Sequence, residues 1–429
     1  MERLIIRGGN KLRGMVMISG AKNAALPILA GSILAGDEVV ITSVPDLDDV
    51  KSMLELLQAL GAKVKRSGSR VVINPAKVEK DEAPYNLIRK MRASFLVAGP
   101  LLAKLNSVRI PLPGGCAIGS RPVDLHLKGF LAMGATITQE SGVIQMDALG
   151  GLRGARIYLD VPSVGATENL LMAASLAMGE TVIENAAREP EVVDLANFLN
   201  NMGAKIRGAG TSVIKIDGVS GLSGISYPVI PDRIEAGTYM IACAVAGGDI
   251  TLQNVVPEHL TAVIAKLTEV GVTIEDLGGG LRVLSDKRPY CTDVTTTPYP
   301  GFPTDLQPQM MTLLSIASGT SVITETIFEG RFMHVAELNR MGADLRIENR
   351  SVIIEGVRRL SGAHVRMPDL RAGAALVLAG IAANGETEIQ DVYHLDRGYE
   401  AMDRKLAGLG ADIARVYDEA QQEPIAQVL

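Results

Sequence analysis

The chain has 429 residues, of which 47% are hydrophobic, which is enough for two or three domains with substantial cores. Its formal net charge of -6 argues against a general nucleic-acid or anionic-membrane binder, because both need a basic excess. Aromatic residues make up 3% of the chain and tryptophan is absent, so we expect no base-stacking platform for a nucleic acid.

The start of the chain, residues 1–10, lacks the basic head and apolar run of a signal peptide, and no apolar run reaches the length of a membrane span. Cys116, Cys243 and Cys291 are far apart, which fits a reducing compartment and shows no zinc-ligand spacing. We therefore expect a cytoplasmic protein with no membrane or nucleic-acid partner, no cofactor and no metal.

Two sequence phrases recur with a period of roughly 70 residues. In the first, a helical pattern ends in glycine and an apolar strand follows, because glycine suits the left-handed conformation that ends helices. Its glycines are Gly61, Gly134, Gly203, Gly271, Gly342 and Gly410. The second phrase is an apolar helix rich in small residues, followed by glycine and a β-rich run. It predicts helices over 25–36, 92–104, 166–179, 236–248, 307–319 and 371–385.

These six helices are apolar almost all round, which requires burial on every side. Three such helices enclosed by amphipathic sheets would satisfy that requirement, so six units divide into two α/β lobes of three units with a cleft between them. Two prolines in the segment 224–231 interrupt the alternation of predicted helices and strands, which indicates that the chain crosses between the lobes there. Periodicity leaves open which lobe contains the N-terminal strand, residues 3–7.

Cations stand at the starts of three of the apolar helices, at Lys22, Arg92 and Arg371. A cation opposes the helix dipole at this end, so a bound anion between side chain and helix would explain the pattern. The alternative is that the cations point to water and that polar residues simply cap the helices. Those candidate caps are Asn23, Ser163, Thr167 and Asp305.

Further cations lie in loops, at Arg121, Arg331 and Arg397, and together with those at the helix starts they predict a polyanionic substrate. Asp305 is the acidic exception. A carboxylate in a cationic cleft suits a base that takes a proton from a hydroxyl, and the same residue could also cap a helix that starts at Leu306.

A thiol stands in a loop of small residues, at Cys116 within the segment 112–125. Prolines bracket this loop and three glycines remove side-chain bulk, so it can close over a ligand. Arg121 can lower the pKa of the thiol, which suits a cysteine used as acid or nucleophile. The alternative is a buried thiol beside a Gly-Pro turn.

Nearly from end to end, the chain resembles the UDP-N-acetylglucosamine enolpyruvyl transferases. The motifs that carry the resemblance are residues 19–27, 91–94, 113–126, 163–167, 184–190, 302–305, 328–331, 369–371 and 396–398. The resemblance implies two inside-out α/β barrels of three repeats each, with the N-terminal strand in the second lobe. The implied boundaries are residues 22–229 for the first lobe and residues 1–21 with 230–429 for the second.

The resemblance implies transfer of the enolpyruvyl group of phosphoenolpyruvate to the 3′-hydroxyl of UDP-N-acetylglucosamine, with release of phosphate, as the first committed step of peptidoglycan precursor synthesis. The implied mechanism is addition and then elimination through a tetrahedral phosphoketal. Cys116 would protonate the methylene carbon and can form a covalent adduct, and Asp305 would assist deprotonation of the hydroxyl. The residues implied to hold phosphoenolpyruvate and the intermediate are Lys22, Asn23, Arg121 and Arg397, of which Lys22 and Arg397 also have a catalytic role.

The implied contacts of the nucleotide sugar are Arg92, Arg121, Pro122, Val123, Asp124, Leu125, Ser163, Val164, Gly165, Asp305 and Ile327. Arg331, Asp369 and Arg371 match supporting positions of the active site. The Cys116 loop would close once the nucleotide sugar binds and would exclude water. Family members with aspartate in place of this cysteine resist fosfomycin, so Cys116 implies sensitivity.

Three rivals remain. The 5-enolpyruvylshikimate-3-phosphate synthases share the fold and the phosphoenolpyruvate chemistry but do not use this cysteine loop. RNA 3′-terminal phosphate cyclase is built from related units but needs a nucleic-acid surface. A nucleotide-sugar sensor on the same scaffold would be expected to lose Cys116, Asp305 or Lys22 first, and all three are present.

Overall fold

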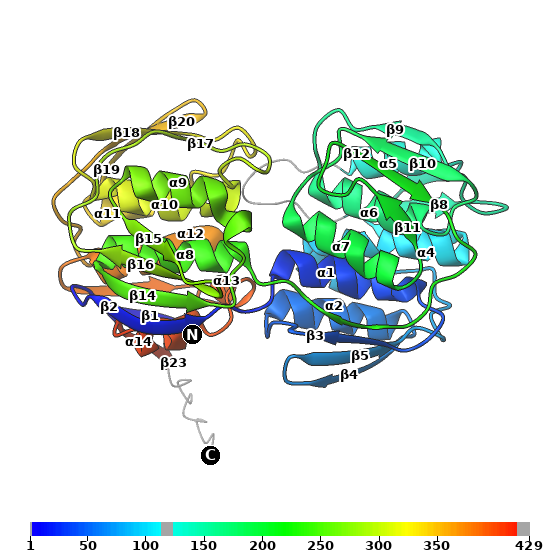
Figure 1. Ribbon diagram of the computed structural model, residues 1–429, viewed down its shortest axis with the longest axis horizontal. Coiled ribbons are helices and arrows are strands. Elements are labelled where there is room, and N and C mark those ends of the chain that lie inside the picture. The colour runs from blue at the N-terminus through cyan, green and yellow to red at the C-terminus, as the bar shows by residue number, and fades with distance from the viewer. Residues whose placement is uncertain (1, 113–122, 418–429) are drawn as a thin grey trace, which may run out of the picture.

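The computed structural model describes residues 2–112 and 123–417. These residues fold into two lobes that lie side by side (Figure 1). The hydrophobic core of the first lobe collects side chains between residues 21 and 229, and that of the second lobe collects side chains of residues 4–18 and 234–411. The chain therefore passes between the lobes twice.

Three helical segments fill the centre of the first lobe and pack on one another. They are α1 (Lys22–Gly31), α4 (Ala98–Leu105) with the short 3-10 helix η2 (Arg92–Val97) before it, and α6 (Val164–Ala174). Almost every side chain of α1 and α6 is buried, as their apolar composition requires. The helix expected over 92–104 is thus divided between η2 and α4.

The second lobe repeats this arrangement with three mutually packed helices. They are α8 (Arg233–Ala246), α10 (Gln307–Ser315), which follows the 3-10 helix η4 (Thr304–Leu306), and α12 (Leu370–Ala382). Nearly all of their side chains are buried. The expected architecture, with buried helices surrounded by sheets in each of two lobes, is confirmed.

Amphipathic helices connect the strands of each unit on the outside. They are α2 (Asp48–Ala59), α5 (Asp124–Ala132), α7 (Pro190–Asn201), α9 (Thr261–Glu269), α11 (His334–Arg340) and α14 (Met402–Gly408). The remaining short helices are η1 (Ser32–Leu34), α3 (Tyr85–Lys90), η3 (Pro257–Leu260) and α13 (Tyr393–Asp396).

Within the described residues the strands form six sheets around the buried helices. The first lobe contains β3 (Val39–Thr42), β4 (Lys63–Ser67), β5 (Arg70–Asn74), β6 (Ser107–Pro111), β7 (Thr136–Glu140), β8 (Val143–Asp147), β9 (Arg156–Tyr158), β10 (Glu180–Glu184), β11 (Lys205–Arg207), β12 (Val213–Asp217) and β13 (Ser226–Pro228). The second lobe contains β1 (Glu2–Arg7), β2 (Leu12–Met17), β14 (Gly248–Gln253), β15 (Thr273–Asp276), β16 (Gly280–Ser285), β17 (Val294–Thr295), β18 (Thr320–Thr324), β19 (Asp344–Glu348), β20 (Ser351–Glu355), β21 (His364–Arg366), β22 (Glu386–Gln390) and β23 (Asp412–Tyr417).

The strands β1 and β13 each complete a sheet by pairing with strands that are far away in the sequence. In the second lobe, β1 lies antiparallel between β22 and β23, with Ile5 opposite Glu388 on one side and Ala414 on the other. It therefore takes the place in the last sheet, of order β21-β22-β1-β23, that β20 takes in the sheet before it. In the first lobe, β13 runs parallel to β3 and completes the first sheet. The N-terminal strand thus pairs with strands of the second lobe.

The recurring glycines adopt the conformation expected from the sequence. At Gly61, Gly134, Gly203, Gly271, Gly342 and Gly410, φ lies between 87° and 112°. Each ends an amphipathic helix and leads into a strand. A side chain at these positions would strain the backbone, so the repeat requires glycine.

Gly99 lets α4 approach the backbone of α6 closely. A Cβ at this position would lie 2.3 Å from the carbonyl oxygen of Asn169 and 2.6 Å from its Oδ1. We expect Gly99→Ala to lower the free energy of unfolding by about 1 to 3 kcal/mol, because the contacted atoms are backbone or hydrogen-bonded and cannot move away cheaply. Urea denaturation measures this.

The matched control is Gly408→Ala, at an exposed helical position where a Cβ would meet nothing within 4 Å. This change should stabilise the chain by about 0.4 to 1 kcal/mol, since it only restricts the unfolded state. Equal effects of the two substitutions would contradict the close packing of α4 on α6.

Candidate active site between the lobes

A buried carboxylate joins one cation from each lobe. Lys22 is the first residue of α1, and its Nζ lies 2.6 Å from Oδ2 of Asp49, a residue of α2 that is 4% exposed. Arg397, which follows α13 in the second lobe, donates from Nε to Oδ1 of the same carboxylate at 2.9 Å. We call this arrangement of Lys22, Asp49 and Arg397 the Asp49 bridge.

The charges of the bridge shift one another's ionisation. Burial acts to raise the pKa of Asp49, but Lys22 and Arg397 outweigh it and hold that pKa below its usual value. Burial lowers the pKa of Lys22, with help from Arg371 and Arg397, and Asp49 opposes the shift. Asp49 is therefore the group that favours the protonated, donating form of Lys22.

A second carboxylate, that of Asp305 in η4, binds two arginines of the second lobe. Its Oδ1 lies 2.9 Å from Nη1 of Arg331, and its Oδ2 accepts from Nη2 and Nε of Arg371 at 2.9 and 3.2 Å. Both arginine side chains are almost completely buried, whereas that of Asp305 is 24% exposed. The expectation that Asp305 also caps the following helix is wrong, because the N-cap of α10 is Leu306 and that of η4 is Pro303.

Asp369 fixes the position of Arg371. It is the N-cap of α12, and its Oδ1 accepts from the backbone amides of Arg371 and Ala372 at 2.7 and 3.1 Å. Burial acts to lower the pKa of Arg371, but Asp305, Tyr399 and Asp232 together outweigh it and raise the pKa. The anion expected beside this helix-start cation is thus a carboxylate of the chain, as Asp49 is for Lys22.

Glu325 is a buried residue that sequence reasoning missed. Its Oε1 accepts from the backbone amides of Ile327 and Phe328 at 2.8 and 3.1 Å. Its Oε2 accepts from the hydroxyl of Thr304 at 2.8 Å, and the same hydroxyl accepts from Nη1 of Arg331 at 2.7 Å. Glu325 therefore holds both the Ile327 segment and the residue before Asp305. A lone glutamate after an apolar strand offers no sequence signal for this role.

The sequence-predicted nucleotide-sugar contacts of the first lobe surround the start of α6. Ser163 is the N-cap of α6 and accepts from the amide of Ala166 at 3.3 Å, so this expected cap is confirmed. Val164 and Gly165 form the first turn, and Arg92 opens η2, which contacts α6. Val123, Asp124 and Leu125 stand at the start of α5, which also packs on α6.

Two residues considered as helix caps have other positions or contacts, and three predicted site residues lie outside the described part of the chain. Asn23 lies in α1 beside Lys22 but does not cap the helix, because the N-cap is Ala21. Thr167 does not cap α6; its hydroxyl accepts from the amide of Ala187 at 3.1 Å. Cys116, Arg121 and Pro122 lie outside the described residues.

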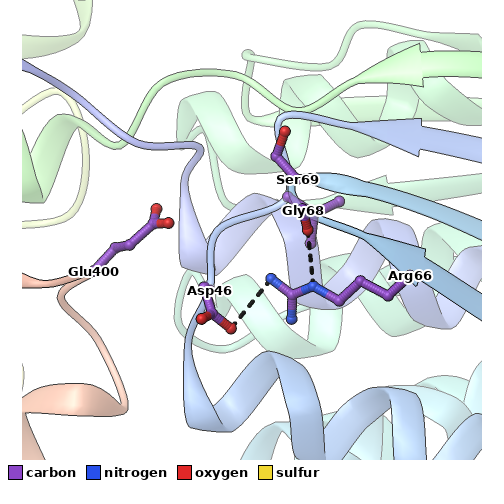
Figure 2. Close-up of a pocket in the computed structure, with 6 residues that line it drawn as sticks. Asp46, Arg66, Gly68, Ser69 and Glu400 are labelled. Carbon is purple, nitrogen blue, oxygen red and sulfur yellow. Dashed lines mark hydrogen bonds and ion pairs between the residues drawn. The ribbon is translucent and has the colours of Figure 1, made fainter.

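A cavity of about 490 Å³ also opens between the lobes, and its walls include no predicted site residue. Figure 2 shows Glu400 of the second lobe facing Asp46 and Arg66 of the first. Arg66 already pairs with Asp46 at 3.3 Å and donates to the carbonyl of Gly68 at 3.0 Å. With two acids and one paired cation, this cavity lacks the positive charge that an anionic ligand needs.

Asp305 with Arg331 and Arg371, which we call the Asp305 cluster, lies close enough to the Asp49 bridge for the charge of Arg371 to lower the pKa of Lys22. Cations from both lobes thus converge beside a partly exposed carboxylate, which suits a small dianion and a hydroxyl nucleophile. Among the described residues, no three histidine, cysteine or carboxylate side chains are grouped as metal ligands. In the same part of the chain, no helix has the length and hydropathy needed to cross a membrane.

Comparison with known proteins gives three groups of matches. The family model of EPSP synthase (3-phosphoshikimate 1-carboxyvinyltransferase) matches residues 6–406. A UDP-N-acetylglucosamine 1-carboxyvinyltransferase 2 of Carboxydothermus hydrogenoformans is 60% identical over 97% of this chain and 100% of its own length. A UDP-N-acetylglucosamine 1-carboxyvinyltransferase of Trichlorobacter lovleyi is 54% identical over 97% of this chain and 99% of its own. The chain belongs to the UDP-N-acetylglucosamine 1-carboxyvinyltransferase family.

Solved structures agree on the fold. The enolpyruvyl transferase NikO of Streptomyces tendae superposes with a TM-score of 0.87 at 25% identity, over 97% of this chain and 99% of that one. An EPSP synthase of Acinetobacter baumannii gives a TM-score of 0.73 at 20% identity, over 97% of this chain and all of that one. The two-lobed arrangement is therefore that of the enolpyruvyl transferases.

For a member of the UDP-N-acetylglucosamine 1-carboxyvinyltransferase family, the structure adds an unexpected feature. The predicted Lys22 and Arg397, which are 375 positions apart in the sequence, meet on one carboxylate that no motif singled out. Asp305, Arg331 and Arg371, predicted from separate motifs, also meet in one cluster. Asp49 lies in an ordinary amphipathic helix pattern, so only the tertiary fold identifies it.

Replacing Asp49 by asparagine removes the negative charge that opposes the shift at Lys22. We expect the pKa of Lys22 to fall further, because burial, Arg371 and Arg397 then act unopposed. Titration of the lysine Cε signals by NMR measures this, with the Lys22 signal assigned from a Lys22→Arg variant.

The control for this measurement is Asp48→Asn, on the same helix but with a side chain that is 50% exposed. It should leave the titration of Lys22 unchanged. An unchanged titration in Asp49→Asn as well would contradict the electrostatic role of the bridge.

Proposed function

We propose that this protein transfers the enolpyruvyl group of phosphoenolpyruvate to the 3′-hydroxyl of UDP-N-acetylglucosamine and releases phosphate, the first committed step of peptidoglycan precursor synthesis. The observation that carries this proposal is that Lys22 and Arg397, one from each lobe, meet on Asp49, and that Arg371, which binds Asp305, acts on Lys22. Relatives at 54% and 60% identity are UDP-N-acetylglucosamine 1-carboxyvinyltransferases, which supports the choice of acceptor. Both substrates are metabolites of the cytoplasm, so we place the reaction there.

Lys22 and Arg397 would bind the phosphate and carboxylate of phosphoenolpyruvate. An ammonium has three donors and a guanidinium five, which is more than their contacts with Asp49 use. Because they come from different lobes, a small dianion held by both would join the lobes. Arg121 is proposed to add a third cation from the Cys116 loop.

The proposed chemistry has two steps. In the first, the 3′-oxygen of the sugar bonds to C2 of phosphoenolpyruvate while Cys116 gives a proton to C3, which yields the tetrahedral phosphoketal. In the second, the C2–O bond to phosphate breaks and C3 returns a proton to the thiolate of Cys116, which restores the double bond in the product and the thiol. Fixed cations around the phosphate and carboxylate would stabilise the charge that develops at both stages.

Asp305 is the proposed acceptor of the hydroxyl proton. Two arginines hold its carboxylate, so it is a weak base but a well-oriented one. A weak base suffices because the hydroxyl becomes strongly acidic only as its bond to C2 forms. Arg331, Asp369 and Arg371 would thus act by positioning Asp305.

The first lobe would bind the nucleotide sugar at the start of α6, through Ser163, Val164 and Gly165. The free backbone amides and the dipole at a helix start favour phosphate oxygens. We propose that further residues contact the nucleotide sugar or the intermediate, namely Arg92, Arg121, Pro122, Val123, Asp124, Leu125, Asn23 and Ile327. We also propose lobe boundaries at residues 22–229 and at 1–21 with 230–429, and the separate hydrophobic cores support them.

Phosphate release from phosphoenolpyruvate tests the acceptor. We expect release with UDP-N-acetylglucosamine and none with shikimate 3-phosphate, and we expect Cys116→Ala to abolish it because the proton donor is lost. Release with shikimate 3-phosphate would move the protein to the sister activity. Tight binding of the nucleotide sugar without release would indicate a sensor.

Fosfomycin tests the position of Cys116 in the site. We expect the epoxide to alkylate this thiol and to do so faster when UDP-N-acetylglucosamine is bound, since that ligand is proposed to close the loop. Mass spectrometry of the intact protein measures the adduct. In Cys116→Asp, alkylation should disappear while phosphate release persists, and alkylation at Cys243 or Cys291 instead would contradict the proposal.

A further inference from the structure

His126 lies in the first turn of α5 and faces the first turn of α6. The starts of both helices carry predicted nucleotide-sugar contacts. Its ring meets the ring of Phe95 edge to face, at 5.1 Å between centroids. A Cβ at position 165 would lie 3.4 Å from Cε1 and 3.6 Å from Nε2 of His126. The imidazole therefore lies within van der Waals reach of position 165, in the first turn of α6.

The tautomer of His126 follows from the hydrogen bonds of Asn169. The Oδ1 of Asn169 accepts from the amide of Gly99 at 2.7 Å, and its Nδ2 donates to the carbonyl of Phe95 at 2.9 Å. These two partners fix which end of the amide is nitrogen. The same Nδ2 lies 3.0 Å from Nδ1 of His126, so Nδ1 must accept, and the ring proton is on Nε2.

The ring is neutral in the pH range in which enzymes work. Burial lowers the pKa of His126 to about 3, and the positive charge of Arg92 adds to this shift. His126 is thus a hydrogen-bond donor without a charge.

The direction of the Nε2–H group follows from the same contacts. Nδ1 contacts residue 169, whereas Cε1 and Nε2 contact position 165, one helical turn nearer the start of α6. The donor therefore points along the helix toward Ser163. Within the described residues, no hydrogen-bond acceptor contacts Nε2 of His126.

We propose that the Nε2–H group of His126 donates a hydrogen bond to the diphosphate of the nucleotide sugar at the start of α6. This inference rests on the proposed function, because it deepens the assignment of that ligand to this end of the helix. The free amides of the first turn and Arg92 supply further donors around the same oxygens. Asn169 is the positioning residue that holds the ring in the donating tautomer.

Two substitutions of His126 distinguish the effect of its Nε2–H donor from the effect of its packing against α6. Asparagine at 126 can place an oxygen where Nδ1 accepts from Asn169, but it has no group at the position of Nε2. Glutamine at 126 can place its amide nitrogen near Nε2 and so retains the donor. Calorimetric titration with UDP-N-acetylglucosamine compares the two variants with the wild type, and titration with uridine, which lacks phosphates, reports on the rest of the nucleotide.

We expect H126N to weaken binding of UDP-N-acetylglucosamine by about tenfold and H126Q by about twofold or less, the tenfold loss being that of one hydrogen bond to a charged oxygen. Uridine should bind all three proteins alike. The ratio of wild-type to H126N affinity should stay constant between about pH 6 and 9, because the ring does not titrate there.

Wild-type affinity in H126N, at unchanged thermal stability, would overturn the proposal, as would a ratio that falls as pH rises through about 6.5, since that would show a cationic ring. An equal loss with uridine would place the contact elsewhere on the nucleotide and would also overturn it. A wild-type protein that binds no nucleotide sugar would instead refute the proposed function, and this inference with it.

Discussion

The junction between the lobes depends on the need of buried cations for a negative partner. Lys22, Arg331 and Arg371 are each at most 7% exposed, and a buried charge without a partner is strongly destabilising. The chain supplies partners from different parts of the fold, Asp49 for Lys22 and Asp305 for the two arginines. A further pair, between Arg233 of the second lobe and Glu191 of the first at 2.9 Å, joins the lobes as the contact of Arg397 with Asp49 does.

This pairing also explains how the site can be ready for an anionic substrate. Cations that were held only by the substrate would repel one another in its absence, whereas carboxylates that bind one face of each cation leave other donors available. The arrangement lowers the positive electrostatic potential of the site, because each carboxylate cancels one positive charge. In return the donors keep fixed positions, and fixed donors contribute most to stabilising charge in a transition state.

The fold could be predicted from the sequence because its helices and turns are determined by short, local sequence patterns. The six glycines that end helices and the six apolar helices each depend on a few neighbouring residues, and both were found at the expected places. Asp49, Glu325 and the tautomer of His126 could not be predicted, since each is defined by partners from other segments. Asp305 is not a helix cap for a related reason: Arg331 of its own unit and Arg371 of the next unit bind its carboxylate. The resemblance named the residues of the site, but only the fold shows which of them touch.

We propose that Asp49 acts on the small substrate through Lys22 and Arg397 together. A double-mutant cycle on kcat/KM for phosphoenolpyruvate, with Asp49→Asn, Arg397→Met and the double variant, tests this joint action. Removal of Asp49 should cost less when Arg397 is already absent, with a coupling free energy above about 1 kcal/mol. Losses that add to within about 0.5 kcal/mol would show instead that the two residues act independently.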